Sequence, residues 1–190
     1  MILPRDGEVE LIERAFDAGE AASWFARLRD GIDWRQEELR IMGRMVAVPR
    51  LTAWYGDHGY RYSGVDHPPR KLTSDLETLR RKAEDLSGAS LNSVLANFYR
   101  SGDDAMGWHA DNERELGGQP VIVSFSFGGA RRFSLKHRHE RTLRVDIELA
   151  GGSCLVMRGA TQTYWLHRIA RTKKAVDPRI NLTFRRILPH

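Results

Sequence analysis

Short runs in the second half of the chain alternate apolar and polar residues with a period of two. In "LNSVLANFY" (91–99), Val94, Ala96 and Phe98 share one face, because successive side chains of a strand point to opposite faces. The same alternation, or a short apolar run, recurs in "VIVSFSF" (121–127), "TLRVDIEL" (142–149), "SCLVM" (153–157) and "RINLTFRRI" (179–187). These runs predict a set of short, antiparallel β-strands.

An amphipathic helix is predicted over residues 16–32, before these strands. Asp17 and Glu20 have the spacing of a capping box, in which each side chain accepts a hydrogen bond from the other residue's backbone. The apolar stripe of this helix consists of Trp24, Phe25 and Leu28.

A second helix is predicted over residues 74–88. Ser74 and Glu77 can cap its start, and Gly88 can end it. Its apolar face consists of Leu76, Leu79, Ala83 and Leu86. Helices followed by many short strands indicate a mainly β (α+β) fold, a β-sandwich or cupin-like jelly roll buttressed by N-terminal helices.

Basic residues are concentrated in the second half of the chain. The 190 residues, enough for one domain with a sizeable core, carry a formal charge of +5. Positive charge gathers in residues 130–144 and 168–174. These stretches favour a polyanionic partner such as nucleic acid, although solvated strand edges would give the same pattern.

The lone cysteine, Cys154, excludes an internal disulfide and fits a reducing compartment. No apolar run has membrane-spanning length, and the sequence turns acidic too soon after its start for a secretory signal. We therefore expect a protein that does not enter membranes, located in the cytoplasm or, in a eukaryote, in the nucleus. A monomer is the default expectation for its oligomeric state.

The segment "MGWHADNERE" (106–115) contains a candidate pair of metal ligands. His109 and Asp111 are two residues apart, so both side chains project to the same side of an extended segment. With one more histidine they would form the facial triad of two histidines and one carboxylate that non-haem iron(II) oxygenases use. An ordinary polar loop can contain the same pair, so the interpretation requires a third ligand.

His167 is the candidate third ligand. It lies in "TYWLHRI" (163–169), between two predicted strands and among aromatic and aliphatic residues. A core histidine with satisfied hydrogen bonds is the alternative interpretation of this position.

The last predicted strand, 179–185, has one apolar and one polar face. The polar face consists of Arg179, Asn181, Thr183 and Arg185. Burying this row unpaired would be unfavourable, whereas a wet face would carry no penalty. A ligand with two carboxylates would satisfy both guanidinium groups, and Asn97 and Tyr99 could add neutral hydrogen bonds.

Several segments together resemble the AlkB family of iron(II)- and 2-oxoglutarate-dependent dioxygenases. They are "NFY" (97–99), "WHADNERE" (108–115), "YWLHRI" (164–169) and "PRINLTFR" (178–185). Three further segments are similar to the branch of this family that repairs alkylated double-stranded DNA: "VPRLTAWYGD" (48–57), "YRYSG" (60–64) and "SFSFG" (124–128). The resemblance therefore extends from about Val48 to Leu188.

The resemblance implies a double-stranded β-helix, which is a variety of jelly roll, forming a single dioxygenase domain over residues 1–190. Residues 1–47 would contain the N-terminal helix and a nucleotide-recognition hairpin. Residues 48–90 would contain a nucleotide-recognition segment and a helix, and residues 91–190 would form the catalytic core.

The resemblance also implies a cofactor site. Iron(II) would be bound by His109, Asp111 and His167, which leave room for 2-oxoglutarate and O2. Arg179 would pair with the distal carboxylate of 2-oxoglutarate, and Arg185 would lie near its other end. The remaining residues around the cosubstrate would be Asn97, Tyr99, Asn181 and Thr183.

Positions that match nucleic-acid contacts in the family come from other segments. Tyr60 and Tyr62 would sandwich a flipped base, Asn112 and Glu113 would lie near the base and its backbone, and Arg50 would touch DNA.

A hairpin is expected at "EELRIMGRM" (37–45), with Ile41 and Met42 at its apolar tip. The family resemblance places a base-replacing wedge there, a role for which apolar side chains have precedent.

The implied activity is oxidative demethylation of 1-methyladenine and 3-methylcytosine in DNA, with release of formaldehyde, succinate and CO2. Within the same superfamily, the alternatives are an RNA demethylase and a protein or small-molecule hydroxylase. A non-enzymatic metal-binding or nucleic-acid-binding barrel is a third interpretation. A zinc hydrolase is a fourth, but it gives no role to two arginines on the last strand.

Overall fold

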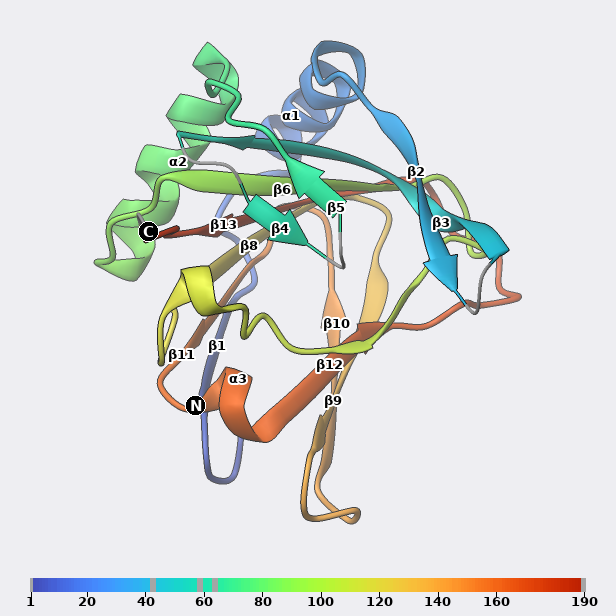
Figure 1. Ribbon diagram of the computed structural model, residues 1–190. Helices are drawn as coiled ribbons and strands as arrows, with labels where there is room; N and C mark the ends of the chain where they lie inside the picture. Colours follow the sequence, from blue (N-terminus) through green and yellow to red (C-terminus); the bar gives the residue numbers. More distant parts are fainter. Residues whose placement is uncertain (1, 42–43, 58–59, 63–64, 189–190) are drawn as a thin grey trace.

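The computed structural model describes residues 2–41, 44–57, 60–62 and 65–188, and the side chains of 39–41, 60–62 and 65–67 lie outside this description. Its strands form two main antiparallel sheets, and α1 and α2 lie beside the larger one (Figure 1). The mainly β class and the jelly roll predicted from the sequence are confirmed.

Among the described residues, the larger sheet has seven strands. In order across the sheet they are β1 (Glu8–Ile12), β11 (Cys154–Arg158), β8 (Ile122–Gly128), β13 (Arg179–Arg185), β6 (Ser93–Tyr99), β3 (Arg44–Gly56) and β2 (Arg35–Ile41). The last predicted strand, β13, therefore lies at the centre of this sheet, between β8 and β6.

The smaller sheet consists of β10 (Arg144–Leu149), β9 (Arg131–His137), β12 (Trp165–Ile169) and β7 (Met106–His109), in that order. A separate hairpin pairs β4 (Tyr60–Tyr62) with β5 (Val65–His67). The short helices are η1 (Arg114–Leu116) and α3 (Thr161–Tyr164). In the part of the chain that the structure describes, no helix combines the length and the apolar composition needed to cross a membrane.

The two longer helices are α1 (Ala18–Gly31) and α2 (Ser74–Ser87). The predicted capping box of α1 is present, since Asp17 and Glu20 accept hydrogen bonds from each other's backbone. The predicted cap of α2 was wrong by one residue: Thr73 accepts from the backbone N–H of Leu76, and Ser74 is already helical. Gly88 ends α2 with a φ of 67°, a left-handed conformation that glycine adopts without strain.

The alternation of β13 separates an apolar layer from the interior of the jelly roll. Ile180, Leu182 and Phe184 are fully buried in the layer that also contains the apolar faces of α1 and α2. Side chains on the opposite face of β13 point between the two sheets. A second apolar layer, which includes Phe133 and Trp165, packs in this interior. The polar row of β13 is therefore buried, and the wet-face interpretation was wrong.

The sequence placed His167 between strands, but it lies within β12. β12 is short, but it pairs with β9 on one side and with β7 on the other. Backbone hydrogen bonds on both edges therefore hold it in the sheet. The predicted hairpin near residues 37–45 is present, because β2 and β3 pair from Arg35 to Ile41.

Candidate metal centre and adjoining pocket

β7 and β12 bring two histidines together at one edge of the smaller sheet. His109 pairs directly with His167 in the antiparallel register, and their ring centroids are 4.1 Å apart. His167 also stacks on Phe133 of β9, with 5.2 Å between ring centroids. Strand pairing thus supplies the third candidate ligand that the His109–Asp111 pair required.

Asp111 lies two residues beyond the end of β7. Its Oδ1 is 3.9 Å from Nε2 of His109, and the ligand atoms of His109, Asp111 and His167 all lie within 4.8 Å of one another. Within the described ranges, this is the one cluster of three such side chains with metal-binding spacing. Two imidazoles and one carboxylate fit iron(II), because they can bind one side of the ion and leave positions for a cosubstrate.

The protonation states of the three side chains suit a metal. Burial lowers the pKa of His167 to about 3, and burial also lowers the pKa of His109, so both rings are neutral at pH 7. Burial opposes ionisation of Asp111, but the Arg185 guanidinium holds the pKa of this carboxyl below its ordinary value. Nδ1 of His109 is 2.8 Å from the Gly107 carbonyl; a proton on Nδ1 makes this hydrogen bond and leaves the Nε2 lone pair for a metal.

Gln162 is a site residue that the sequence did not indicate. It lies in α3, is 2% exposed, and its Oε1 accepts a hydrogen bond of 2.9 Å from the backbone N–H of Asp111. Its Nε2 lies 3.5 Å from Sδ of Met157. Gln162 follows Asp111 by 51 residues, and no sequence motif links the two positions. Only the structure shows that Gln162 fixes the loop that carries Asp111.

A pocket adjoins the three ligands, lined by the polar face of β13 and by apolar side chains of the second layer. Arg179 lines it at 1% exposure, and its Nη2 donates to Oγ of Ser126 at 2.8 Å. Its Nε and Nη1 are buried and have no hydrogen-bond partner among the described residues. Burial lowers the pKa of Arg179 to about 10, so it stays charged at neutral pH. A buried cation with open donors suits a carboxylate ligand.

The amides and hydroxyls predicted around the cosubstrate form one hydrogen-bonded group. Thr183 Oγ1 donates to Oδ1 of Asn181 at 3.0 Å, and Nδ2 of Asn97 approaches the same oxygen at 3.4 Å. Nδ2 of Asn181 donates to Oγ of Ser124 at 2.6 Å. With Tyr99 these residues line the pocket, so the structure brings the predicted polar set together.

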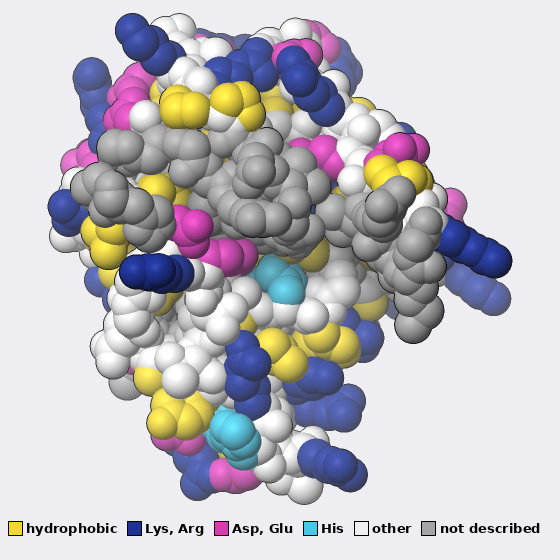
Figure 2. Space-filling model, viewed as in Figure 1, with side chains coloured by type: hydrophobic (Ala, Val, Ile, Leu, Met, Phe, Trp, Pro, Cys, Tyr) yellow, Lys and Arg dark blue, Asp and Glu magenta, His cyan; other side chains and the backbone are white. Residues whose placement is uncertain are grey.

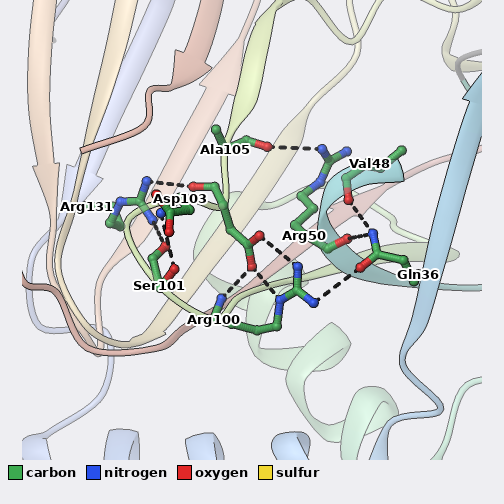
Figure 3. A network of polar contacts seen from close by, with 9 residues as sticks. Gln36, Val48, Arg50, Arg100, Ser101, Asp103, Ala105 and Arg131 are labelled. Carbon is green, nitrogen blue, oxygen red and sulfur yellow. Dashed lines mark hydrogen bonds and ion pairs between the residues drawn. The ribbon is translucent and has the colours of Figure 1, made fainter. Parts of the chain in front are cut away.

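Arg50, predicted to touch DNA, points into the protein. It is 5% exposed, and its Nε donates to Oδ1 of Asn97 at 2.7 Å. Its Nη1 donates to the Ala105 carbonyl at 3.3 Å (Figure 3). The register of β2 and β3 shifts beside Gln36, whose side-chain amide bonds the carbonyls of Val48 and Arg50 across the irregularity. The described contacts of Arg50 thus support the cosubstrate pocket, and its contact with DNA stays a prediction.

Arg185 and the residues after Asp111 lie on the metal side of the pocket. Nη2 of Arg185 is 3.0 Å from Oδ1 of Asp111, and both side chains are 2% exposed. Arg185 thereby orients a candidate ligand and also lines the pocket where the near end of a cosubstrate would lie. Asn112 is exposed, and Glu113 is half-buried immediately before η1.

The predicted base-contacting tyrosines and the wedge residue Ile41 lie on two hairpins. Tyr60 and Tyr62 are on β4, opposite β5, and their side chains lie outside the description. Ile41 ends β2 opposite Arg44 of β3, and its side chain is likewise not described. Met42 lies outside the described residues, so the wedge stays a prediction.

Comparison with known proteins agrees with this geometry. A family model described as "2OG-Fe(II) oxygenase superfamily" matches residues 8–185. The chain is 38% identical over 182 residues to alpha-ketoglutarate-dependent dioxygenase alkB homolog 3 of Bos taurus, covering 91% of this chain and 64% of that protein. It is 37% identical over 186 residues to DNA oxidative demethylase ALKBH2 of Mus musculus, covering 92% and 78%.

The chain thus spans a little under two thirds of the length of the bovine relative. A solved structure, that of OsALKBH1, matches with a TM-score of 0.69 over 95% of this chain and 97% of that chain, at 17% sequence identity. This match shows a shared fold. The family model, the relatives and the His-Asp-His cluster agree, and the chain belongs to the AlkB family of the 2OG-Fe(II) oxygenase superfamily.

Proposed function

We propose that the protein is an iron(II)- and 2-oxoglutarate-dependent oxidative demethylase that repairs 1-methyladenine and 3-methylcytosine in DNA. The observation that carries this proposal is the convergence of two neutral imidazoles and a carboxylate beside a buried arginine with two open donor nitrogens. A metal site alone would fit many functions. A metal site next to an unpaired, buried guanidinium fits a metal and a carboxylate cosubstrate together.

Iron(II), 2-oxoglutarate and O2, when bound, supply the oxidising chemistry that hydroxylates an N-methyl group, which then leaves as formaldehyde while succinate and CO2 form. The protein's own residues bind and orient. His109, Asp111 and His167 would hold the metal, and Arg179 would hold the distal carboxylate of the cosubstrate. Arg185 keeps Asp111 ionised and oriented through their 3.0 Å contact. Apolar walls of the pocket exclude water from the reaction.

DNA is the substrate class that the relatives and the charge distribution favour. One group of relatives is named DNA oxidative demethylase. Figure 2 shows Lys and Arg side chains at many places on this face, including its lower half. Lys136 and Arg168 lie 4.5 and 4.4 Å from the Trp108 ring centroid. Such cations suit phosphate groups of a nucleic acid, and RNA is the alternative partner. We expect a monomer that acts in the cytoplasm or, in a eukaryote, in the nucleus.

The two lesions are those that the resemblance to the AlkB family implies, and the chemistry of the proposed base site suits them. Methylation at these positions blocks Watson–Crick pairing, which makes the base easier to flip out of a duplex. The methylated ring is cationic, and stacking between Tyr60 and Tyr62 would stabilise it. Glu113 would add an opposite charge near the base.

The test is a repair assay. The protein is incubated without oxygen with iron(II), 2-oxoglutarate and a duplex oligonucleotide that carries 1-methyladenine, and air is then admitted. We expect formaldehyde and unmodified adenine in equal amounts. Both should disappear in Asp111→Ala and in Arg179→Ala, whereas the exposed-site control Arg186→Ala should retain them.

Other outcomes would redirect the assignment. Succinate formation without base repair would indicate a hydroxylase of another substrate class, which methylated RNA and peptide substrates would then identify. Absence of any 2-oxoglutarate turnover, with a folded and iron-loaded protein, would contradict the proposed function.

A further inference from the structure

Arg131 is a buried cation behind the cosubstrate pocket. It is the first residue of β9, is 4% exposed, and does not line the pocket itself. Its Nη1 donates to the Ser101 carbonyl at 3.1 Å (Figure 3). Its Nη2 donates to the carbonyls of Asp104 and Ala170 at 2.9 and 2.8 Å. Arg131 therefore ties the loop after β6 to the end of β12.

Within the described residues, Arg131 makes no direct ion pair, and the Asp104 carboxylate interacts with its charge only at longer range. The carboxylate of Asp104 is already engaged by Arg100, whose Nε and Nη2 donate at 2.8 and 2.9 Å and whose backbone N–H donates at 2.8 Å. In the described part of the chain, Arg131 contacts neutral carbonyl oxygens and no carboxylate directly. Its positive charge therefore makes the electrostatic potential in the adjoining cosubstrate pocket more positive.

Tyr99 connects Arg131 with the pocket. The Tyr99 ring is 2% exposed and lines the pocket. The Arg131 guanidinium carbon lies 5.6 Å from the ring centroid, and that of Arg179 lies 5.3 Å from it. Both distances fall within the range of cation–π contacts. Two buried cations therefore share one aromatic ring, at the point where Arg179 has open donors.

We propose that Arg131 is a positioning residue for the dicarboxylate cosubstrate, acting through Tyr99 and the two loops it ties together. The positive charge raises the affinity for the distal carboxylate without touching it. The three carbonyl contacts hold β6 and β12 at the spacing that places Tyr99 beside Arg179. This inference rests on the proposed function, because it assumes that the pocket binds 2-oxoglutarate.

The chain supplies a matched control in the adjacent residue. Arg132 is on the same strand, but its side chain is 71% exposed and lies 3.8 Å from Asp146 on the surface. Arg131→Met removes the buried charge, Arg131→Lys keeps it, and Arg132→Met removes one charge at the surface. Arg131→Gln removes the charge but keeps amide donors for the carbonyls, so it serves if the methionine variant does not fold.

The experiment measures the dissociation constant for 2-oxoglutarate by calorimetry, without oxygen, on protein loaded with manganese(II). Arg131→Met or Arg131→Gln should weaken binding about tenfold, equivalent to about 1.4 kcal/mol. Arg131→Lys should stay within about threefold of the unaltered protein, and Arg132→Met should not change binding. In turnover, the KM for 2-oxoglutarate should rise, and the KM for the oligonucleotide should not.

The outcomes separate the two proposals. If the unaltered protein binds 2-oxoglutarate and the neutral Arg131 variants bind it equally well, the role of Arg131 is refuted while the proposed function stands. Equal weakening in Arg131→Lys and Arg131→Met would also refute the role of the charge. If the unaltered protein does not bind 2-oxoglutarate at all, the proposed function fails and the role of Arg131 fails with it.

Discussion

Replacing Arg179 by methionine should make the ligand-free protein more stable while abolishing cosubstrate binding. The side chain is 1% exposed, donates to Ser126 and lies over the Tyr99 ring, while two of its nitrogens have no hydrogen-bond partner in the described structure. Burial lowers its pKa from 12.5 to about 10. Below pH 10 both the folded and the unfolded chain carry this charge, so the folded state bears the whole penalty at pH 7.

The size of the effect follows from these values. A depression from 12.5 to about 10 corresponds to about 3 kcal/mol of destabilisation at neutral pH. The lost hydrogen bond to Ser126 offsets about 1 kcal/mol of the gain. Methionine of similar length can pack in the space, so the net increase in unfolding free energy is about 2 kcal/mol. For a chain of this size, this corresponds to a rise of about 4–8 °C in the unfolding midpoint.

Calorimetry of metal-free protein, with and without 2-oxoglutarate, provides the assay. The loss of two charged hydrogen bonds should weaken 2-oxoglutarate binding by more than about 100-fold, so the ligand should no longer raise the midpoint of Arg179→Met. Arg186→Met, at the exposed residue after β13, is the control and should change neither quantity. A lower midpoint for Arg179→Met, together with an intact response to 2-oxoglutarate, would refute this reasoning.

Three further predictions concern the metal centre and the fold. Gln162→Met should lower manganese(II) affinity about tenfold in a titration, because it removes the 2.9 Å contact that fixes the aspartate loop, whereas the exposed control Thr163→Ala should not. Because the pKa of His167 falls from 6.5 to about 3, the metal-free protein should lose stability as the pH falls from 6.5 towards 3; an equal loss in His167→Asn, measured by denaturant titration, would contradict this assignment. Thr73→Ala should cost about 1 kcal/mol of unfolding free energy through the lost helix cap, and equal destabilisation by Ser74→Ala would argue against Thr73 as the cap.

Periodicity in the sequence was sufficient to predict the fold class and the division of β13 into an apolar and a polar face. The alternation placed Ile180, Leu182 and Phe184 on the face opposite the polar residues, and the structure shows that this apolar face packs against the helices. The resemblance added the identity of the metal ligands. Their pairing depends on the register of β7 with β12, a contact between distant segments that periodicity alone does not specify.

Other features depend on tertiary contacts that leave no local pattern. Gln162 approaches Asp111 only because α3 packs beside the loop after β7. Arg50 points inward where the pairing of β2 with β3 shifts register, and a sequence pattern does not show where such a shift occurs. The cap of α2 was misplaced because Thr73 and Ser74 are both good capping residues, and only the backbone shows which of them precedes the first helical turn.

The most direct test of the account is an anomalous diffraction measurement at the iron absorption edge, on crystals loaded with iron(II) and 2-oxoglutarate without oxygen. The account predicts one strong peak within bonding distance of His109, Asp111 and His167, with 2-oxoglutarate density extending from it to Arg179. An iron peak at other side chains, or cosubstrate density that does not reach Arg179, would contradict it.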